Sequence, residues 1–307
     1  MIKTMDIVYF ANHDVGCACL ERLIKHNFAP RLVIVQQTDK EECLTYQSVE
    51  KLAQCNGIET FLYKPAWHNS LILKLKDISP DLLISVAWRY IFKKDILKLP
   101  RLAAINFHGS LLPKCRGANP TNWAIISGEK ETGVTAHFID EGIDTGDVII
   151  QKKIKIGNDD TAYSLRIKQD KVSISIMDEL ISYFPSGKFP RKQQNDTEAT
   201  FFKQRKPEDG LVHWDSMTSQ QVYDFVRALT KPYPGAFFQI GDEKITLWKV
   251  RSFWKEQTRA PGIFEIPLNG DPFISTIDGY IALIEFECLE KHFFLEKGKS
   301  YDLCSLN

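Results

Sequence analysis

Two stretches decide the fold of this chain: Ala104-Ile-Asn-Phe-His-Gly-Ser-Leu-Leu-Pro-Lys-Cys-Arg-Gly-Ala-Asn-Pro120 and Gly133-Val-Thr-Ala-His-Phe-Ile-Asp-Glu-Gly-Ile-Asp-Thr-Gly-Asp-Val148. Each joins an apolar run to a polar loop that contains glycine, which is typical of a buried strand that ends at a loop. Asn106 and His108 lie two residues apart at the end of the first run, so their side chains point to the same side of an extended strand. We therefore expect an amide and an imidazole to project together from one strand end.

Asp144 adds a carboxylate in the second loop. An amide donor, a titratable imidazole and a carboxylate can form an acyl-transfer site, in which Asn106 stabilises an oxyanion, His108 acts as the base and Asp144 orients His108. Each residue alone has a commoner structural explanation, because a strand-end histidine usually belongs to the core and Asp-Thr-Gly-Asp is a turn sequence. Their combination favours the catalytic interpretation.

The residues before this stretch alternate between predicted strands and helices. Strands are predicted at residues 6–11, 31–36, 60–63, 81–87 and 103–108. Helices are predicted at residues 15–25, 48–56, 69–78, 91–97 and 161–183. Several strands are apolar on both faces, which predicts an α/β fold with a doubly wound, mainly parallel sheet and a ligand at the carboxyl ends of its strands. No Gly-x-Gly-x-x-Gly follows the first strand, so a dinucleotide cofactor is not expected.

The rest of the chain predicts a second, smaller domain. Residues 186–204 are polar and resemble a linker between a domain of residues 1–185 and one of residues 205–307. After a turn and helix at residues 212–229, short strands are predicted at residues 236–240, 245–250, 262–266, 273–277 and 281–287. This pattern predicts a small OB-like β-barrel. Residues 291–307 match no pattern that we can interpret.

Composition limits the partners and the compartment. The 307 residues carry equal numbers of basic and acidic side chains, so no general attraction to nucleic acid or to a membrane is expected. The first ten residues lack the apolar core and cleavage site of a signal peptide, and no apolar run is long enough to span a bilayer. The seven cysteines are scattered and show no zinc spacing, which predicts reduced thiols, a cytoplasmic protein and no bound metal.

The central stretch resembles the signature of the 10-formyltetrahydrofolate-dependent formyltransferases, Asn-x-His-Gly-Ser-Leu-Leu-Pro-x-x-Arg-Gly-x-x-Pro, then Gly-Val-Thr, then Asp-x-Gly. Three other strings are most similar to the nucleotide-sugar N-formyltransferases, above all the formyltransferase domain of the aminoarabinose enzymes of polymyxin resistance. They are Phe10-Ala-x-His13-Asp-x-Gly16-Cys, Trp88-Arg89-Tyr-Ile and Arg227-Ala-x-x-Lys-Pro-Tyr-Pro234-Gly235-Ala-Phe.

The resemblance implies an enzyme that moves a formyl group from 10-formyltetrahydrofolate to the amine of a dTDP- or UDP-linked amino sugar, here a 4-amino sugar for surface polysaccharide such as lipopolysaccharide O-antigen. It also implies a folate pocket and closing loops made of Trp88, Arg89, Tyr90, Ile91, Phe92, Ser110, Leu111, Leu112, Pro113, Ile139, Asp140, Glu141, Gly142 and Ile143. For Trp88, packing on the core is an equal alternative. The second domain has two open roles, which are homodimer formation and substrate binding.

The acceptor end is interpreted from residue chemistry. His13 and Asp14 follow the first strand at its ligand-facing end, and the Arg116-Gly117 loop lies near the transferred group by the resemblance. Tyr233 has a ring that can stack on a base or sugar, and Arg205 or Arg227 has the forked guanidinium that suits a phosphate. The alternatives are a capping turn for His13 and Asp14, a packed turn for Tyr233, and surface charges for Arg205 and Arg227.

Three other functions fit parts of the sequence. A methionyl-tRNA formyltransferase would share the triad, but residues 205–307 hold 12 Lys/Arg and 15 Asp/Glu, a net charge of −3, where a tRNA-binding surface should be basic. Residues 36–50 likewise hold one Lys and four acidic residues, where the tRNA enzymes resembled carry a basic insertion loop. A formyltetrahydrofolate hydrolase has no evident need for such a second domain. The third alternative is a folate- or sugar-binding module without catalysis. The set of Asn106, His108 and Asp144 argues against it, because binding alone needs no general base beside an oxyanion donor.

Overall fold

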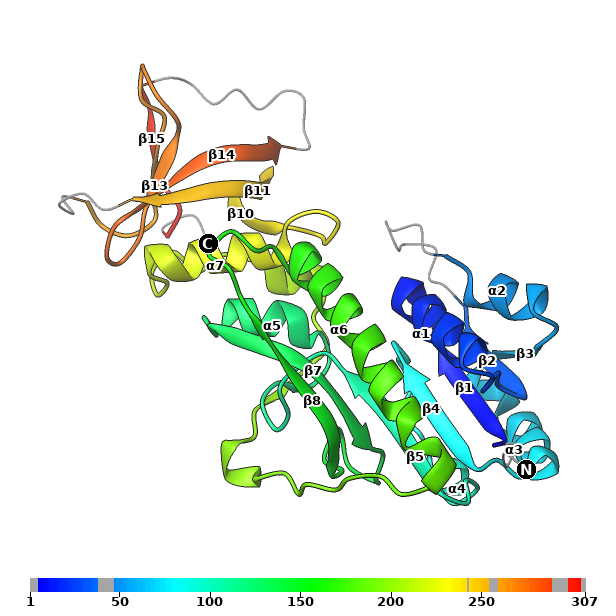
Figure 1. The fold of residues 1–307 in the computed structure, drawn as a ribbon. Coiled ribbons are helices and arrows are strands. Elements are labelled where there is room, and N and C mark those ends of the chain that lie inside the picture. The colour runs from blue at the N-terminus through cyan, green and yellow to red at the C-terminus, as the bar shows by residue number, and fades with distance from the viewer. Residues whose placement is uncertain (1–4, 38–46, 242, 254–258, 289–297, 305–307) are drawn as a thin grey trace. The chain divides into compact units, whose positions relative to one another are not determined.

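The chain forms two compact units (Figure 1). The computed structural model describes residues 5–37, 47–241, 243–253, 259–288 and 298–304. The first unit comprises Met1–Pro120, Glu131–Lys155 and Arg166–Lys203. The second unit comprises Thr121–Lys130, Ile156–Leu165 and Gln204–Asn307. Among the described helices, none is long and apolar enough to cross a membrane.

The first unit is built on a seven-stranded sheet in the order β3-β2-β1-β4-β5-β7-β8. The strands are β1 (Ile7–Ala11), β2 (Leu32–Gln36), β3 (Glu59–Tyr63), β4 (Leu82–Val86), β5 (Ala103–His108), β7 (Glu131–Phe138) and β8 (Val148–Lys155). The first five strands in this order are parallel, whereas β7 runs antiparallel to β5 and β8 antiparallel to β7. This arrangement confirms the predicted doubly wound, mainly parallel sheet.

Helices cover both faces of this sheet. They are α1 (His13–Lys25), α2 (Val49–Cys55), α3 (His68–Ile78), α4 (Lys94–Leu97) and α6 (Ala162–Ser182). On one face, Leu71 and Leu75 of α3 are buried in one cluster with alternate residues of the strands, such as Phe10. On the other face, the hydroxyl of Tyr9 donates to the Gly16 carbonyl of α1 at 2.9 Å. Alternation along β1 therefore decides which helix each side chain meets.

The starts of two helices differ from the sequence prediction by two residues or more. Helix α1 begins at His13 rather than at Val15, with Asn12 in the extended N-cap conformation and His13 itself at a positive φ of 63°. Helix α4 begins at Lys94 rather than at Ile91, so Ile91 belongs to the loop that follows β4. Short 3₁₀ turns occupy Pro65–Trp67, Phe184–Ser186, Asp196–Glu198 and Pro207–Gly210.

Residues 186–203, most of the predicted linker, lie with the first unit. Strand β9 (Phe201–Phe202) pairs in parallel with β6 (Arg116–Gly117), and Lys192 pairs with Val148 by two backbone hydrogen bonds of 2.8 and 2.9 Å. The polar side chains that make this segment resemble a linker include groups that hydrogen-bond to the central loops, which a composition-based interpretation does not detect.

The second unit contains helices and the predicted small β domain. Helix α5 (Pro120–Ile126) contributes most of its residues to this unit, and α7 (Ser219–Leu229) precedes the sheet. The six strands are antiparallel in the order β10-β11-β14-β13-β12-β15. They are β10 (Ala236–Ile240), β11 (Glu243–Phe253), β12 (Ile263–Glu265), β13 (Phe273–Ser275), β14 (Tyr280–Cys288) and β15 (Ser300–Asp302). The sequence misses β15, which lies in the uninterpreted tail; residues 291–297 and 305–307 of that tail lie outside the described residues.

Gly235 provides a test of this unit. It lies between α7 and β10 with φ +90°, and an added Cβ would lie 2.4 Å from Cγ2 of Thr246 and 2.8 Å from the ring of Trp248. We expect Gly235→Ala to lower the free energy of unfolding by about 2–4 kcal/mol, through a left-handed alanine and an overpacked contact. Gly241→Ala is the control, because Gly241 has φ +58° and nothing within 4 Å, so only the backbone cost of about 1–2 kcal/mol applies. Urea unfolding followed by tryptophan fluorescence measures both, and equal losses would contradict the steric argument.

Candidate functional site

The candidate site lies at the carboxyl ends of the parallel strands. In the order β3-β2-β1-β4-β5, the chain turns to opposite sides after β1 and after β3, so the crevice between β1 and β4 is the topological switch point. His13 and Asp14 follow β1, Arg89 follows β4, and His108 ends β5. The predicted site residues of the first unit therefore come from neighbouring strand ends.

His108 is buried and both of its ring nitrogens have neighbours. Nε2 lies 2.8 Å from the carbonyl oxygen of Cys115, which can only accept, so Nε2 carries the proton and donates it to that carbonyl. Nδ1 lies 3.4 Å from Oδ2 of Asp144. Burial lowers the pKa of His108 below its ordinary value, while the charge of Asp144 and the Cys115 carbonyl oppose that shift. His108 is thus neutral at physiological pH, and Nδ1 is its basic atom.

Asp144 is held in its charged form. Burial alone would raise the pKa of Asp144, but His108, His137 and the backbone N–H of Gly117 together lower it below the ordinary range. The Gly117 N–H donates to Oδ2 at 2.9 Å, and Nε2 of His137 lies 3.4 Å from Oδ1. A charged carboxylate beside Nδ1 stabilises the imidazolium form of His108 whenever that atom takes a proton.

Asn106 has an amide orientation fixed by its neighbours. The hydroxyl of Ser85 donates to Oδ1 at 2.8 Å, which leaves Nδ2 facing Nε2 of His137 at 3.3 Å. The sequence analysis did not single out His137, which therefore joins the predicted residues. Its Nδ1 donates to the Phe138 carbonyl at 2.8 Å, so its Nε2 faces both Asn106 and Asp144.

The signal for His137 was present in the sequence but needed the strand direction. His137 lies two residues after Thr135 in the Gly-Val-Thr string, and antiparallel pairing of β7 with β5 places it opposite Asn106. The structure thus brings Asn106, His108 and Asp144 together, with His137 beside both Asn106 and Asp144.

The loop after β5 is closed by internal hydrogen bonds. The Ser110 hydroxyl donates to the Lys114 carbonyl at 2.6 Å, and the Thr135 hydroxyl donates to the Ser110 carbonyl at 2.7 Å. Ser110 and Leu112 are buried. Arg116 is only 2% exposed, and its guanidinium binds Gln194 and Asp196. For Arg116, the geometry favours a structural contact over contact with an acceptor.

The two segments predicted to bind folate face each other. Lys94, at the start of α4, forms a 2.6 Å ion pair with Glu141 in the loop after β7. Ile91 and Ile143 present apolar side chains that are 74% and 50% exposed, which is unusual for large aliphatic residues and suits an apolar ligand between the loops. The aromatic rings of this region pack as a group: Trp88 contacts Phe10, Tyr63, Tyr90 and Phe92, with ring centroids 5.3–6.4 Å apart. Core packing is therefore the better account of Trp88.

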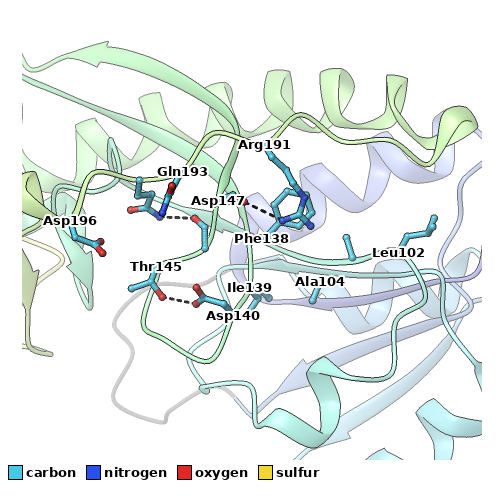
Figure 2. Close-up of a pocket in the computed structure, with 13 residues that line it drawn as sticks. Leu102, Ala104, Phe138, Ile139, Asp140, Thr145, Asp147, Arg191, Gln193 and Asp196 are labelled. Carbon is cyan, nitrogen blue, oxygen red and sulfur yellow. Dashed lines mark hydrogen bonds and ion pairs between the residues drawn. The ribbon is translucent and has the colours of Figure 1, made fainter.

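The loop of Asp140 is shaped by its own side chain. Asp140 accepts from the Gly142 N–H at 3.0 Å and from the Thr145 hydroxyl at 2.6 Å. Behind this loop lies a cavity of about 380 Å³ near the start of β5. Figure 2 shows that Arg191 extends over Phe138 in this cavity and pairs with Asp147, at 3.2 Å. Ile139 and Asp140 of the predicted folate pocket line the same cavity.

A charged cluster surrounds His13 at the switch point. Burial, with Arg166 and Arg89, lowers the pKa of His13 to about 4, against the opposing charge of Asp14. Burial raises the pKa of Asp170 to about 6, which Asp14 reinforces and Arg166 opposes. Arg166 and Asp170 are residues that the sequence analysis missed, although their four-residue spacing places them on one face of the predicted helix.

The other two predicted acceptor residues belong to the second unit. The guanidinium of Arg205 lies 4.9 Å from the ring centroid of Trp123 and 5.3 Å from that of Phe225, and it donates to the Asp209 carbonyl. Tyr233 lies in the turn before β10, and its backbone N–H donates to the Thr230 carbonyl at 3.1 Å. In the described part of the chain, no group of three His, Cys, Asp or Glu side chains is placed to hold a metal ion.

Comparison with known proteins matches both units. The formyl transferase family model matches residues 6–181, and the formyl transferase C-terminal domain model matches residues 205–292. The bifunctional polymyxin resistance protein ArnA of Wigglesworthia glossinidia brevipalpis is 37% identical over 271 residues, which is 88% of this chain and 41% of that protein. The chain thus spans about two fifths of the length of this relative.

Solved structures share the fold. WlaRD, described as a sugar 3N-formyl transferase and solved with dTDP and 5-N-formyl-THF, has a TM-score of 0.68 and 24% identity, over 94% of this chain and 99% of that one. The N-formyltransferase from Helicobacter canadensis, solved with folinic acid and dTDP-3-aminofucose, has a TM-score of 0.69 and 22% identity, over 92% and 100%. Because the first family model covers more than half of the residues and the curated relative exceeds 30% identity, this chain belongs to the formyl transferase family of enzymes.

Proposed function

We propose that this protein transfers a formyl group from 10-formyltetrahydrofolate to the amine of a nucleotide-linked amino sugar. The observation that carries the proposal is the convergence of Asn106, His108 and Asp144 at the carboxyl edge of the sheet. It is supported by the names of the relatives, since two proteins of the same fold were solved with a formylated folate and with dTDP or a dTDP-amino sugar. The similarity to ArnA supports a sugar acceptor and, with the turn at residues 231–235, leads us to propose a 4-amino sugar.

The proposed reaction uses one residue for each change of charge. The neutral amine attacks the formyl carbon, and negative charge develops on the formyl oxygen, to which Nδ2 of Asn106 donates; one such donor is worth about 3–4 kcal/mol. Nδ1 of His108 takes the proton that the amine loses and returns it to the leaving nitrogen of the folate as the carbon–nitrogen bond breaks. Asp144 stabilises the imidazolium between these two steps.

The acceptor is proposed to enter at the switch point. The cluster there contains basic and acidic side chains, those of His13, Asp14, Arg166 and Asp170. Their hydrogen-bond donors and acceptors suit the hydroxyl and amine groups of a sugar. A methionyl-tRNA acceptor stays the main alternative, and the net charge of −3 over residues 205–307 argues against it.

A substrate panel tests this function. Purified protein with 10-formyltetrahydrofolate is given UDP- and dTDP-linked 3-amino and 4-amino sugars, with initiator methionyl-tRNA beside them. We expect one sugar nucleotide to gain one formyl group by mass, with stoichiometric release of tetrahydrofolate. Formylation of the tRNA alone, or folate release without any acceptor, would replace the proposal with the corresponding rival.

His108→Ala tests the base. We expect kcat to fall by about 10²–10⁴-fold, because the proton acceptor is lost, while binding of 5-formyltetrahydrofolate by calorimetry stays within a few-fold of wild type. His26→Ala is the control, since this imidazole is 41% exposed and pairs with Asp178 on α6. Near wild-type kcat in His108→Ala would remove His108 from the mechanism.

Asp144→Asn tests the electrostatic pairing through pH. Asp144 raises the pKa of His108 against the effect of burial, so its neutralisation should lower that pKa further. The base is active only when neutral, and the acid limb of the kcat profile should therefore move to lower pH, while the plateau falls because the imidazolium loses its partner. A histidine titration by NMR gives the same pKa independently, and a shift of either curve to higher pH would contradict the pairing.

A further inference from the structure

The side chain of Gln194 makes every hydrogen bond that an amide can make. Its Oε1 accepts from Nε of Arg116 at 3.1 Å and from Nη2 of Arg116 at 2.8 Å. Its Nε2 donates to the carbonyl of Asp144 at 2.9 Å and to the carbonyl of Gly146 at 2.7 Å. The residue is 9% exposed, although both neighbours in the sequence are exposed. A buried, fully satisfied amide in a polar segment holds its surroundings in one arrangement.

The two loops that Gln194 joins are the loops that hold His108. Cys115, which accepts from Nε2 of His108, precedes Arg116 in the chain. Asp144, which faces Nδ1 of His108, is anchored by its own carbonyl on Gln194. Gly117 also joins the two loops, because its N–H donates to Oδ2 of Asp144. Both contacts of the imidazole therefore depend on the spacing of two loops that are held together by the Gln194 amide and by the Gly117–Asp144 hydrogen bond.

Asp144 needs such an anchor. Its backbone has φ 54°, a left-handed conformation that residues other than glycine adopt only where the surroundings hold them. The carbonyl of Asp144 points to Nε2 of Gln194 in that conformation, while the carboxylate points to Gly117 and His108.

We propose that Gln194 is a positioning residue, whose amide holds the Arg116 loop and the Asp144 loop at the spacing that keeps the Asp144 carboxylate on His108. Those tests of this proposal that measure formyl transfer rest on the proposed function. Gln194 itself acts through Asp144 and needs no contact with the folate or the acceptor.

The chemistry of the four bonds explains why an amide suits this place. A carboxylate would still accept both Arg116 bonds, but it would set an oxygen against the carbonyls of Asp144 and Gly146 and leave both without a donor. An apolar side chain would leave the buried guanidinium with only Asp196, whose side chain is 82% exposed. The cavity beside the Asp144 loop is lined by Gln194 and Gly146, so water can occupy the space left by a shorter side chain. Truncation should therefore loosen the spacing without preventing folding.

Gln194→Glu separates the two halves of the contact, because it keeps the bonds to Arg116 and removes those to Asp144 and Gly146. We expect kcat to fall by about 10–100-fold, the cost of a small misplacement of a catalytic group, with the KM for folate within about threefold of wild type. Gln193→Glu is the matched control, since it adds the same charge at an exposed neighbour and should leave kcat unchanged. Gln194→Ala should give a loss similar to that of Gln194→Glu without an added charge.

A double-mutant cycle shows whether the effect passes through Asp144. In the Asp144→Asn background, Gln194→Ala should change kcat less than about twofold, because the contact that it positions is already gone. Multiplicative losses would place the action of Gln194 elsewhere and overturn the proposal, as would a kcat for Gln194→Glu within twofold of that for Gln193→Glu. Failure of both Gln194 variants to fold, judged by their melting curves, would make the residue purely structural and also overturn it.

A readout without turnover keeps this test independent of the substrate. The pKa of His108, followed by NMR in free enzyme, should fall in Gln194→Ala because Asp144 withdraws, and should not fall in Gln193→Ala. If the pKa falls as expected while no acceptor in the panel is formylated, the positioning role stands and the proposed function fails. If an acceptor is formylated and the pKa does not move, the positioning role fails alone.

Discussion

The buried guanidinium of Arg116 is the interaction on which the arrangement of the site depends. A charged group with 2% exposure must be hydrogen-bonded, because a buried charge without partners costs several kcal/mol. The ion pair to Asp196 is screened, since that carboxylate is 82% exposed, whereas the enclosed amide of Gln194 accepts two hydrogen bonds from the guanidinium. Satisfying Arg116 therefore draws the polar segment 191–202 onto the central loops, where β9 pairs with β6. A stretch with the composition of a linker becomes part of the site for this reason.

Burial acts on both His108 and Asp144, yet His108 ends in its neutral form and Asp144 in its charged form. It favours the neutral form of each, and His108 has only Asp144 and one carbonyl to oppose it, so its pKa falls. Asp144 receives a backbone N–H and faces two imidazoles, so its pKa also falls and the carboxylate stays charged. A neutral imidazole beside a fixed negative charge suits the proton transfer that we propose. Nε2 of His137 lies 3.3 Å from Nδ2 of Asn106 and 3.4 Å from the same carboxylate.

The sequence predicts those features that depend on local pattern. The apolar run of residues 103–108 gives β5 with its correct bounds, and two-residue spacing places Asn106 and His108 at its end. His137 needs the antiparallel direction of β7, which no local pattern encodes, and Gln194 needs a partner about 80 residues earlier in the chain. Arg116 is expected near the transferred group only by the family resemblance, whereas the fold buries it against Gln194 and Asp196. Strand β15 is missed because three residues in a polar tail carry no periodicity.

The site is held in a conformation that its own residues do not favour. Among the described non-glycine residues, seven have positive φ, and five of them lie at this edge of the sheet: His13, Ala87, Cys115, Asn119 and Asp144. For Ala87 and Cys115 the cost is about 1–2 kcal/mol each, while asparagine and aspartate tolerate the region better. The Cys115 conformation accompanies the carbonyl contact to Nε2 of His108, and that of Asp144 accompanies the carboxylate contact to Nδ1. Thr135, Gln169 and Gln194, all buried, hydrogen-bond to the backbone of these loops at Ser110, Gly109 and Asp144. Folding therefore already holds these groups in position, so they need little rearrangement when charge moves in the proposed reaction. This is what is meant by a preorganised site.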